Sequence, residues 1–188
     1  MVQKFELMVQ DDAAKLENIP IIIVMLSNEM QERVERAVSL FKSGYNCSQS
    51  VVAAFADLYG VEEQQALRMS ASFGGGIGRM RQTCGAACGM FMLAGLDCGT
   101  TDPKDREAKS HNYAVVQELA RQFKETTGSL ICGELLGLTK NEQTGTSPQA
   151  EARTPAYYAK RPCTEMVRTA ARLFAEFLTQ QKQAKAEA

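Results

Sequence analysis

The spacing of apolar residues constrains this chain to a helical fold. From Asn28 onward they recur every three or four positions, and no segment alternates with the two-residue period of a strand. These positions are Met30, Val34, Ala37, Val38 and Phe41, then Tyr113, Val116, Leu119, Ala120 and Phe123, and finally Val167, Ala170, Ala171, Phe174 and Leu178. The pattern predicts an all-α protein, a single-domain bundle of about six helices.

Capping residues and glycines set the expected helix ends. Helices are expected over residues 28–43, 46–59, 62–72, 84–96, 104–127 and 162–181, with Thr83 as the N-cap of the fourth and a short helical turn at 130–137. The polar stretch 139–154 is expected to be a loop. The predicted organisation is an N-terminal extension 1–27, either disordered or from a misassigned start, a helical domain 28–180 and a solvated tail 181–188.

Composition excludes several classes of function. The 188 residues carry a net charge of −1 and are 45% hydrophobic, so the chain can bury a core but has no charge excess for nucleic acid. The apolar run at residues 21–26 is far shorter than the ~20 residues that a membrane span needs. The residues before it lack the features of a secretory signal. We therefore expect a cytoplasmic protein with no membrane span and no nucleic-acid partner.

The cysteines are numerous for a reducing compartment, where structural disulfides do not persist. They are Cys47, Cys84, Cys88, Cys98, Cys132 and Cys163. No two have the CxxC spacing and His111 is the only histidine, so zinc-finger and thioredoxin patterns are both absent. Metal binding, redox chemistry and core packing are the uses that this leaves.

Four of the cysteines open predicted helices: Cys47, Cys84, Cys132 and Cys163. At a helix start the free amides and the helix dipole favour an anion by about 0.3–1 kcal/mol, which makes a thiol more acidic. If these helix starts converge, the four thiolates form the ligand set of an iron–sulfur cluster or a zinc site, or else two dithiol pairs. The alternative is that each cysteine is simply buried as a small apolar residue.

The other two cysteines give weaker signals. Cys88 lies one turn after Cys84 on the same helix face, so it is a resolving thiol, an extra ligand or a core residue. Cys98 lies at a predicted helix end beside Gly99, and nothing near it indicates chemistry. His111 is expected to be an ordinary helix side chain.

The glycine-rich run FGGGIGR ends at Arg79, five residues before Cys84. It lacks the GK[ST] ending of a P-loop and follows no predicted strand. Its glycines can let the backbone approach a cofactor or a neighbouring helix, while Arg79 and Arg81 offset thiolate charge; a plain flexible link is the alternative. The sequence shows no paired-carboxylate motif and no Ser/His/Asp set, which argues against a catalytic site for hydrolysis or phosphoryl transfer.

The segments around these cysteines are similar to those of a known family. They are NCSQSV with Cys47, the FGGGIGR run, the hexad CGAACG from Cys84, FKETTGSLICGELLG with Cys132, and Cys163 before the last helix. In these segments the chain resembles the C_GCAxxG_C_C family of bacterial and archaeal redox-active proteins, from about residue 38 to 178. In the hexad, glycine follows the cysteine, whereas in the family label it precedes the cysteine.

The resemblance implies that Cys47, Cys84, Cys132 and Cys163 hold a prosthetic group, with an iron–sulfur cluster the usual suggestion. It also implies an oxidoreductase or a transporter-linked redox protein as the partner. Cys88 and Cys98 fall outside the family pattern.

Three hypotheses follow. In the first, the four family cysteines bind an iron–sulfur cluster or a similar metal centre, and the protein transfers electrons to a partner oxidoreductase; zinc is the alternative metal, in a structural role. In the second, the protein is a thiol–disulfide oxidoreductase in which Cys84 attacks and Cys88 or another family cysteine resolves. In the third, it is a structural metal-binding or interaction module without redox activity. Whether the chain is an enzyme, and whether it forms a homodimer, stays open at this point.

Overall fold

The computed structural model describes residues 25–144 and 147–187, so most of the predicted N-terminal extension lies outside the described residues. The described residues form nine α-helices and two 3-10 helices, and they contain one isolated β-bridge but no strand. The elements are α2 (Asn28–Lys42), α3 (Cys47–Ala53), η1 (Ala56–Tyr59), α4 (Glu63–Ser70), η2 (Ala71–Phe73), α5 (Gly85–Cys98), α6 (Arg106–Thr127), α7 (Cys132–Leu135), α8 (Lys140–Thr144), α9 (Pro155–Lys160) and α10 (Cys163–Glu187). The all-α prediction is confirmed, and the six expected helices correspond to α2, α3, α4, α5, α6 and α10.

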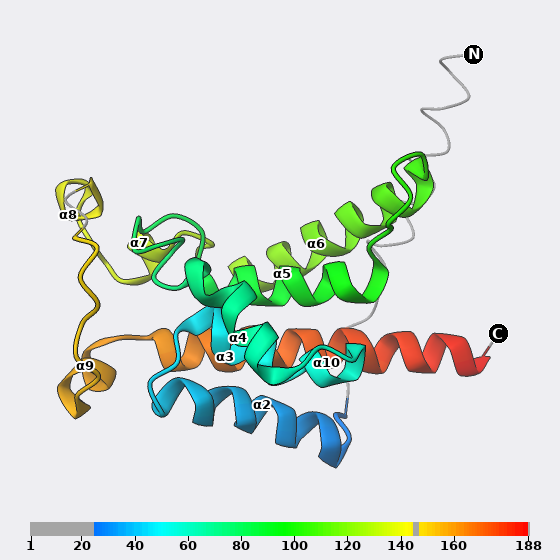
Figure 1. Cartoon of the computed structure of the whole chain (residues 1–188), viewed down its shortest axis with the longest axis horizontal. Coiled ribbons are helices and arrows are strands. Elements are labelled where there is room, and N and C mark those ends of the chain that lie inside the picture. The colour runs from blue at the N-terminus through cyan, green and yellow to red at the C-terminus, as the bar shows by residue number, and fades with distance from the viewer. Residues whose placement is uncertain (1–24, 145–146, 188) are drawn as a thin grey trace.

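The long helices pack in layers around α10 (Figure 1). Helix α2 runs along one side of α10, and the pair α5 and α6 runs along the other. The short helix α3 contacts α2, α4, α5 and α10, which places it at the centre of the bundle. Helices α7, α8 and α9 gather at the end of the molecule where α10 begins.

The core lies where α2, α3, α5 and α10 meet. Phe41, Phe55, Phe123 and Phe174 are fully buried, and the Phe55 and Phe174 rings pack edge to face with centroids 5.2 Å apart. Helix α5 is apolar on nearly all sides, as its sequence predicts for a central helix. At Gly89 an added Cβ would lie 3.0 Å from the Ser48 carbonyl oxygen, so the absent side chain lets α5 approach α3 closely.

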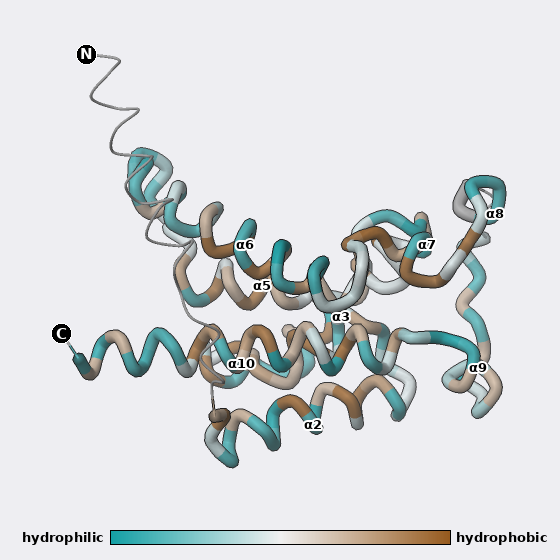
Figure 2. The backbone as a smooth tube through the Cα atoms, turned by 180° about the vertical axis from the view of Figure 1, so that it is seen from behind, coloured by the Kyte–Doolittle hydropathy of each residue, from teal (hydrophilic) through white to brown (hydrophobic). Residues whose placement is uncertain are grey.

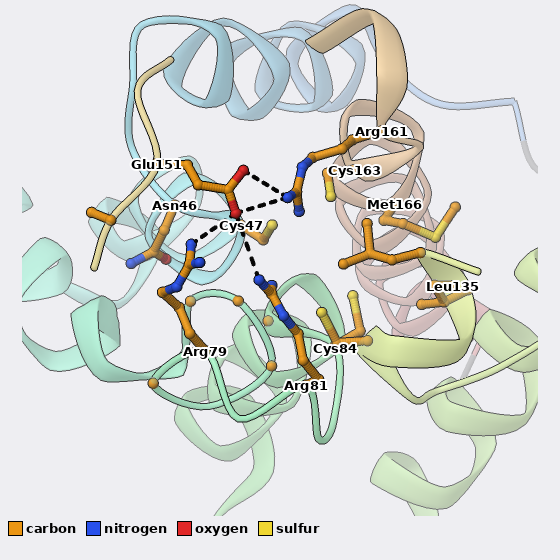
Figure 3. Close-up of a pocket in the computed structure, with 18 of the residues that line it drawn as sticks. Asn46, Cys47, Arg79, Arg81, Cys84, Leu135, Glu151, Arg161, Cys163 and Met166 are labelled. Carbon is orange, nitrogen blue, oxygen red and sulfur yellow. Dashed lines mark hydrogen bonds and ion pairs between the residues drawn. The ribbon is translucent and has the colours of Figure 1, made fainter. Parts of the chain in front are cut away.

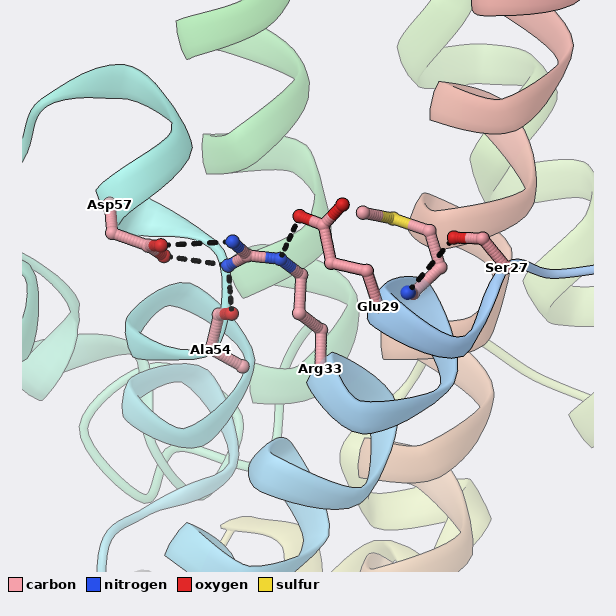
Figure 4. A network of polar contacts seen from close by, with 6 residues as sticks. Ser27, Glu29, Arg33, Ala54 and Asp57 are labelled. Atoms are coloured by element: carbon pink, nitrogen blue, oxygen red, sulfur yellow. Dashed lines mark hydrogen bonds and ion pairs between the residues drawn. The ribbon is translucent and has the colours of Figure 1, made fainter.

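An arginine connects α2 to the end of α3 (Figure 4). The two terminal nitrogens of Arg33 donate to the two carboxylate oxygens of Asp57, over 2.7 and 2.9 Å. Nη1 also donates to the Ala54 carbonyl over 3.1 Å, and Nε donates to Glu29 over 3.3 Å. The hydrogen bonds from Arg33 lower the pKa of Asp57.

The structure differs from the predicted helix bounds in three places. The helix expected over 46–59 ends after Ala53, because Arg33 binds the Ala54 carbonyl and the amide of Leu58 bonds to Phe55 instead, which starts η1. The stretch 139–154, predicted as a loop, contains the helix α8, and a second unpredicted helix, α9, follows it with Thr154 as its cap. Helix α10 continues to Glu187 through the predicted tail, and Figure 2 shows its projecting end as mostly hydrophilic.

None of the helices in the described ranges is long and apolar enough to cross a membrane.

Candidate functional site: a cavity lined by four cysteines

Four cysteines from four parts of the chain line one cavity of about 270 Å³. Cys47, Cys132 and Cys163 are the first residues of α3, α7 and α10, and Cys84 is the N-cap of α5. The prediction that these cysteines lie at helix starts is therefore confirmed, and the structure brings the four starts together. Cys88 and Cys98 are not among the residues that line the cavity.

The start of α3 is fixed by a reciprocal cap. The Asn46 side chain accepts a hydrogen bond from the amide of Gln49, and the Gln49 side chain accepts one from the amide of Asn46. Asn46 also donates to the Ala71 carbonyl over 2.8 Å, next to the glycine-rich run. This cap holds Cys47 at the cavity wall.

A single β-bridge between Thr83 and Ile131 sets Cys84 beside Cys132. On either side of the bridge, the amide of Cys84 donates to Leu130 and the amide of Cys132 donates to Gln82, both over 2.7 Å. Because Thr83 belongs to the bridge, the helix starts one residue later than predicted. The predicted N-cap of α5 is therefore wrong by one residue, and Cys84 is the N-cap. Two cysteines 48 positions apart are thus fixed by backbone contacts.

Most residues of the glycine-rich run have left-handed backbone conformations. Residues 75–79 all have φ between +58° and +75°, and Ile77 and Arg79 are in this conformation despite their side chains. At Gly76 an added Cβ would lie 2.5 Å from Cβ of Cys132, so only glycine fits there. The prediction that these glycines permit a close approach is confirmed, and what approaches at Gly76 is a cysteine.

Three arginines converge on one carboxylate at the cavity, and we call them the arginine cluster: Arg79, Arg81 and Arg161 (Figure 3). Arg161 donates from Nη2 to both carboxylate oxygens of Glu151, over 2.7 and 2.8 Å. Nη1 of Arg79 lies 3.1 Å from Glu151 Oε1, and Nη2 of Arg81 lies 3.7 Å from the same oxygen. One carboxylate thus neutralises one of three positive charges.

A fourth arginine, Arg153, also lines the cavity. Its guanidinium lies 5.0 Å from the ring centroid of Phe41 and 4.6 Å from that of Tyr157, within cation–π range. Its Nη2 donates to the Tyr45 carbonyl over 3.5 Å, whereas its Nη1 is buried and has no hydrogen-bond partner within the described ranges. Among the described residues that line the cavity, Glu151 is the only acidic one, so four guanidinium groups face one carboxylate.

The thiols of Cys47 and Cys163 act as a pair. A hydrogen bond between them raises the pKa of Cys47 well above its ordinary value and lowers that of Cys163 to about 7. Arg161, Arg153 and Arg81 lower the pKa of Cys163 further, against the effect of burial. Cys163 is therefore the thiol of the cavity that ionises most readily.

At Cys84 and Cys132, burial raises the pKa of the thiol more than the position at a helix start lowers it. It raises the pKa of Cys84 to about 12, although the amides of Ala86 and Ala87 act in the opposite direction. Burial also raises the pKa of Cys132, against the charge of Arg81. The expectation that every helix-start thiol becomes more acidic is wrong for Cys84 and Cys132, because desolvation disfavours the thiolate more than the helix start favours it. It is also wrong for Cys47, whose pKa is raised first by the hydrogen bond with Cys163 and then by burial.

The two remaining cysteines have separate surroundings. Cys88 is buried on α5, its Sγ lies 3.9 Å from the Thr83 carbonyl oxygen, and burial raises its pKa to about 11. Cys98 donates to the Ala94 carbonyl over 3.2 Å and accepts from Asn112 over 3.3 Å. Neither residue adds a thiol to the cavity wall.

The thiols are close enough to affect one another but do not form a site for a single ion. The pKa of Cys47 responds to the charges of Cys163, Cys84 and Cys132. Across residues 25–144 and 147–187, however, no group of three or more His, Cys, Asp or Glu side chains is arranged to hold one metal ion. The four thiols therefore line the cavity and do not converge on one point at which a single metal ion could bind.

Three charged residues of the cavity were missed by the sequence analysis: Glu151, Arg153 and Arg161. Arg161 carried a usable signal, because a basic residue two positions before a helix-start cysteine favours its thiolate. Glu151 and Arg153 lie in the polar stretch predicted as a loop, and nothing local relates them to cysteines elsewhere in the chain.

The chain was compared with known proteins. Residues 45–177 match the model of a family described as "Putative redox-active protein (C_GCAxxG_C_C)". The comparisons with curated proteins and with solved structures gave no significant match.

Proposed function

We propose that this chain, which belongs to the C_GCAxxG_C_C family, is an electron-transfer protein that binds an iron–sulfur cluster or a similar metal centre on its four converging cysteines. The observation that carries the proposal is that Cys47, Cys84, Cys132 and Cys163 line one cavity. Four cysteine thiolates are the usual ligand set of such clusters, which supply one-electron redox chemistry when bound.

The arrangement of the thiols favours a centre of more than one metal ion. Cys47 and Cys163 form one hydrogen-bonded pair, and Cys84 and Cys132 flank the β-bridge as a second. Clusters with two irons are held by four cysteines, and two pairs around a shared space suit that ligand count. A lone zinc ion is less well supported, because no three donors of the described residues are arranged around one point.

Charge and hydrogen bonding support the same proposal. Four ionised thiolates in a buried site need compensation, and four arginines against one carboxylate provide it. The buried Nη1 of Arg153 has no acceptor among the residues that the structure places, and a thiolate or sulfide in the cavity would supply one. Cys47, Cys84 and Cys132 are themselves buried, so a group bound among them would be shielded from solvent on that side.

Metal analysis and a visible spectrum test the proposal. Protein purified without oxygen should contain iron and acid-labile sulfide in a fixed ratio to the chain, and its absorbance should bleach on reduction. Cys84→Ser should lose most of the iron, whereas Cys98→Ser, the matched control away from the cavity, should retain it. Colourless wild-type protein without iron would overturn the proposal, and bound metal with a spectrum insensitive to reduction would indicate a structural role.

The paired thiols favour thiol–disulfide exchange as a second candidate. The Cys163 thiolate would attack a low-molecular-weight disulfide, forming a mixed disulfide and releasing one thiolate. Cys47 would then lose its proton and attack Cys163 Sγ, releasing the second thiolate and leaving a Cys47–Cys163 disulfide. This assigns the attacking thiol differently from the prediction, in which Cys84 attacks and Cys88 or another family cysteine resolves, because the hydrogen-bonded pair is Cys47 with Cys163.

Mass spectrometry distinguishes these assignments in metal-free protein. Treatment with oxidised glutathione should yield a Cys47–Cys163 disulfide and two equivalents of reduced glutathione. A disulfide between Cys84 and Cys88, or between Cys84 and another family cysteine, would support the predicted assignment instead, and scattered modification without a defined disulfide would contradict both.

A further inference from the structure

The arginine cluster holds more positive charge than its partner can neutralise. Arg79, Arg81 and Arg161 share the single carboxylate of Glu151. One guanidinium fork is enough to bind a carboxylate or a phosphate through two parallel hydrogen bonds. With three guanidinium groups around one carboxylate, some N–H donors and positive charge remain unused. They can bind a further anion, or an anion of higher charge in place of the carboxylate.

We propose that the arginine cluster is a binding site for a small oxyanion, a phosphate or a carboxylate, and that Glu151 is the chain's own competing occupant. In this site the ligand takes the position of the Glu151 carboxylate and bonds to Arg161 and Arg79. The inference goes beyond the proposed function, because it requires no metal centre on the cysteines.

The surroundings of Glu151 support its role as an exchangeable occupant. It belongs to residues 147–154, which form no helix or strand, and its side chain is 38% exposed. The arginines lie deeper, with Arg81, Arg161 and Arg79 side chains 10%, 21% and 23% exposed. When this carboxylate leaves, two of the guanidinium groups keep other contacts: Arg161 lies 4.7 Å from the ring centroid of Tyr157, and Arg79 Nε donates to the Ser147 carbonyl over 2.9 Å.

The low exposure of the arginines also favours a small ligand over an acidic protein surface. A folded partner could reach little of guanidinium groups that are this shielded, whereas a single phosphate or carboxylate fits where one carboxylate already lies. The cavity that adjoins the cluster has room for the body of a small molecule, at about 270 Å³.

The guanidinium nitrogen of Arg153 that has no partner among the described residues, which a thiolate or sulfide would also satisfy, fits an oxyanion in this cavity. Arg153 lines the same cavity, and its buried Nη1 lacks a hydrogen-bond partner among residues 25–144 and 147–187. Buried donors in native proteins nearly always have a partner, and an anion in the cavity is one that four arginines would attract.

If Glu151 competes with the ligand, removal of its carboxylate should increase the affinity of the site for an anion. A tethered group competes at an effective concentration of roughly millimolar, so free phosphate must exceed that range to displace it. Removing the carboxylate abolishes the competition and leaves three guanidinium groups without an anion. We therefore expect Glu151→Gln to bind inorganic phosphate at least about ten-fold more tightly than the wild type, at one site per chain.

Calorimetric titration of the full chain with inorganic phosphate, and separately with acetate, tests the proposal and separates the two ligand types. The matched control is Glu125→Gln, because Glu125 pairs with a single exposed arginine, Arg121, on α6. The control should bind phosphate as the wild type does. Adding Arg161→Gln to Glu151→Gln should reverse the gain.

Equal phosphate affinity of Glu151→Gln and the wild type would overturn the proposal, as would a gain that survives Arg161→Gln. If Glu151→Gln is too unstable for titration, phosphate should raise its Tm more than that of Glu125→Gln, and equal shifts would also overturn it. The same contrast is expected in iron-free protein, so failure of the cluster proposal and failure of this one give different results.

Discussion

The packed middle of the bundle and the end that contains the cavity are built from the same helices, but the middle buries apolar side chains whereas the cavity end gathers cysteines and charged side chains. In the middle, α3 and α10 contribute Val51, Val167 and Phe174, which are fully buried among apolar neighbours. At their starts, the same helices present Cys47 and Cys163 to a cavity with four arginines and one carboxylate. Close packing stabilises the middle of the bundle. This stability can offset the free-energy cost of crowded positive charge and of residues with positive φ at the cavity end.

The largest expected effect concerns thiol reactivity, and it lies within the cavity end, where a partly exposed thiol beside arginines is compared with a buried one. In metal-free protein we expect iodoacetamide to modify Cys163 at least about 100-fold faster than Cys84 near neutral pH, because the thiolate is the nucleophile. The pKa of Cys163 is about 7 and that of Cys84 about 12. The rate at Cys163 should rise with pH to a half-maximum near 7, as followed by mass spectrometry.

Denaturation provides the control for this comparison, since all cysteines should then react at similar rates. Arg161→Gln should move the Cys163 midpoint to higher pH, because Arg161 lowers the pKa of this thiol. Equal rates at Cys163 and Cys84 in the folded protein would contradict the assignment of an ionised thiol to the cavity.

The packed middle should respond most strongly to truncation of a core ring. Phe174→Ala removes a fully buried side chain that packs edge to face on Phe55, and we expect a loss of about 3–5 kcal/mol in the free energy of unfolding. Urea denaturation measures this loss. Phe177→Ala, one turn later and only partly buried, should cost clearly less. A loss below about 1 kcal/mol for Phe174→Ala would contradict a close-packed core.

The Arg33–Asp57 contact contrasts with the arginine cluster, because here one arginine forms a bidentate pair with one carboxylate and also contacts a second, that of Glu29. Because the Asp57 side chain is 53% exposed, we expect Asp57→Asn to cost about 1 kcal/mol or less at neutral pH. The folded-state pKa of Asp57 is lowered, so its contribution is present above the ordinary aspartate pKa of about 4 and lost as pH falls through the folded value.

Wild type and Asp57→Asn should therefore differ in stability at neutral pH and converge in strong acid, as measured by urea denaturation at a series of pH values. Glu32→Gln, on the exposed face of α2, serves as the control and should show no such convergence. A stability difference that stays constant down to strong acid would show that the Asp57 charge is not involved.

Periodic features of the sequence predicted the packed middle well. Apolar spacing identified α2, α6 and α10, and the apolar composition of α5 placed it centrally. The end of α3 was missed because it depends on Arg33 binding a carbonyl 21 residues away. Local periodicity contains no information about such a contact.

At the cavity end, residue type and helix position predicted the four cysteines but not their ionisation. Burial raises the pKa of Cys84, and the extent of burial depends on the packing of α3, α7 and α10 around it. Glu151 reaches the arginine cluster from a stretch with no periodic pattern. Its place in the site follows from tertiary structure alone.

The smallest effect concerns Ser48 and Ser50, two fully buried serines on α3 next to Cys47. Ser50 donates from Oγ to the Asn46 carbonyl over 2.8 Å, whereas Ser48 Oγ has no partner among the described residues. A buried hydroxyl without a hydrogen bond costs free energy, and a bonded one contributes about 1 kcal/mol. We therefore expect opposite signs in urea denaturation: Ser48→Ala should stabilise the protein by about 0.5 kcal/mol, and Ser50→Ala should destabilise it by about 1 kcal/mol. If Ser48→Ala destabilises the protein as much as Ser50→Ala does, the Ser48 hydroxyl has an acceptor, and the polar environment of the cavity end extends one residue further into the packed middle.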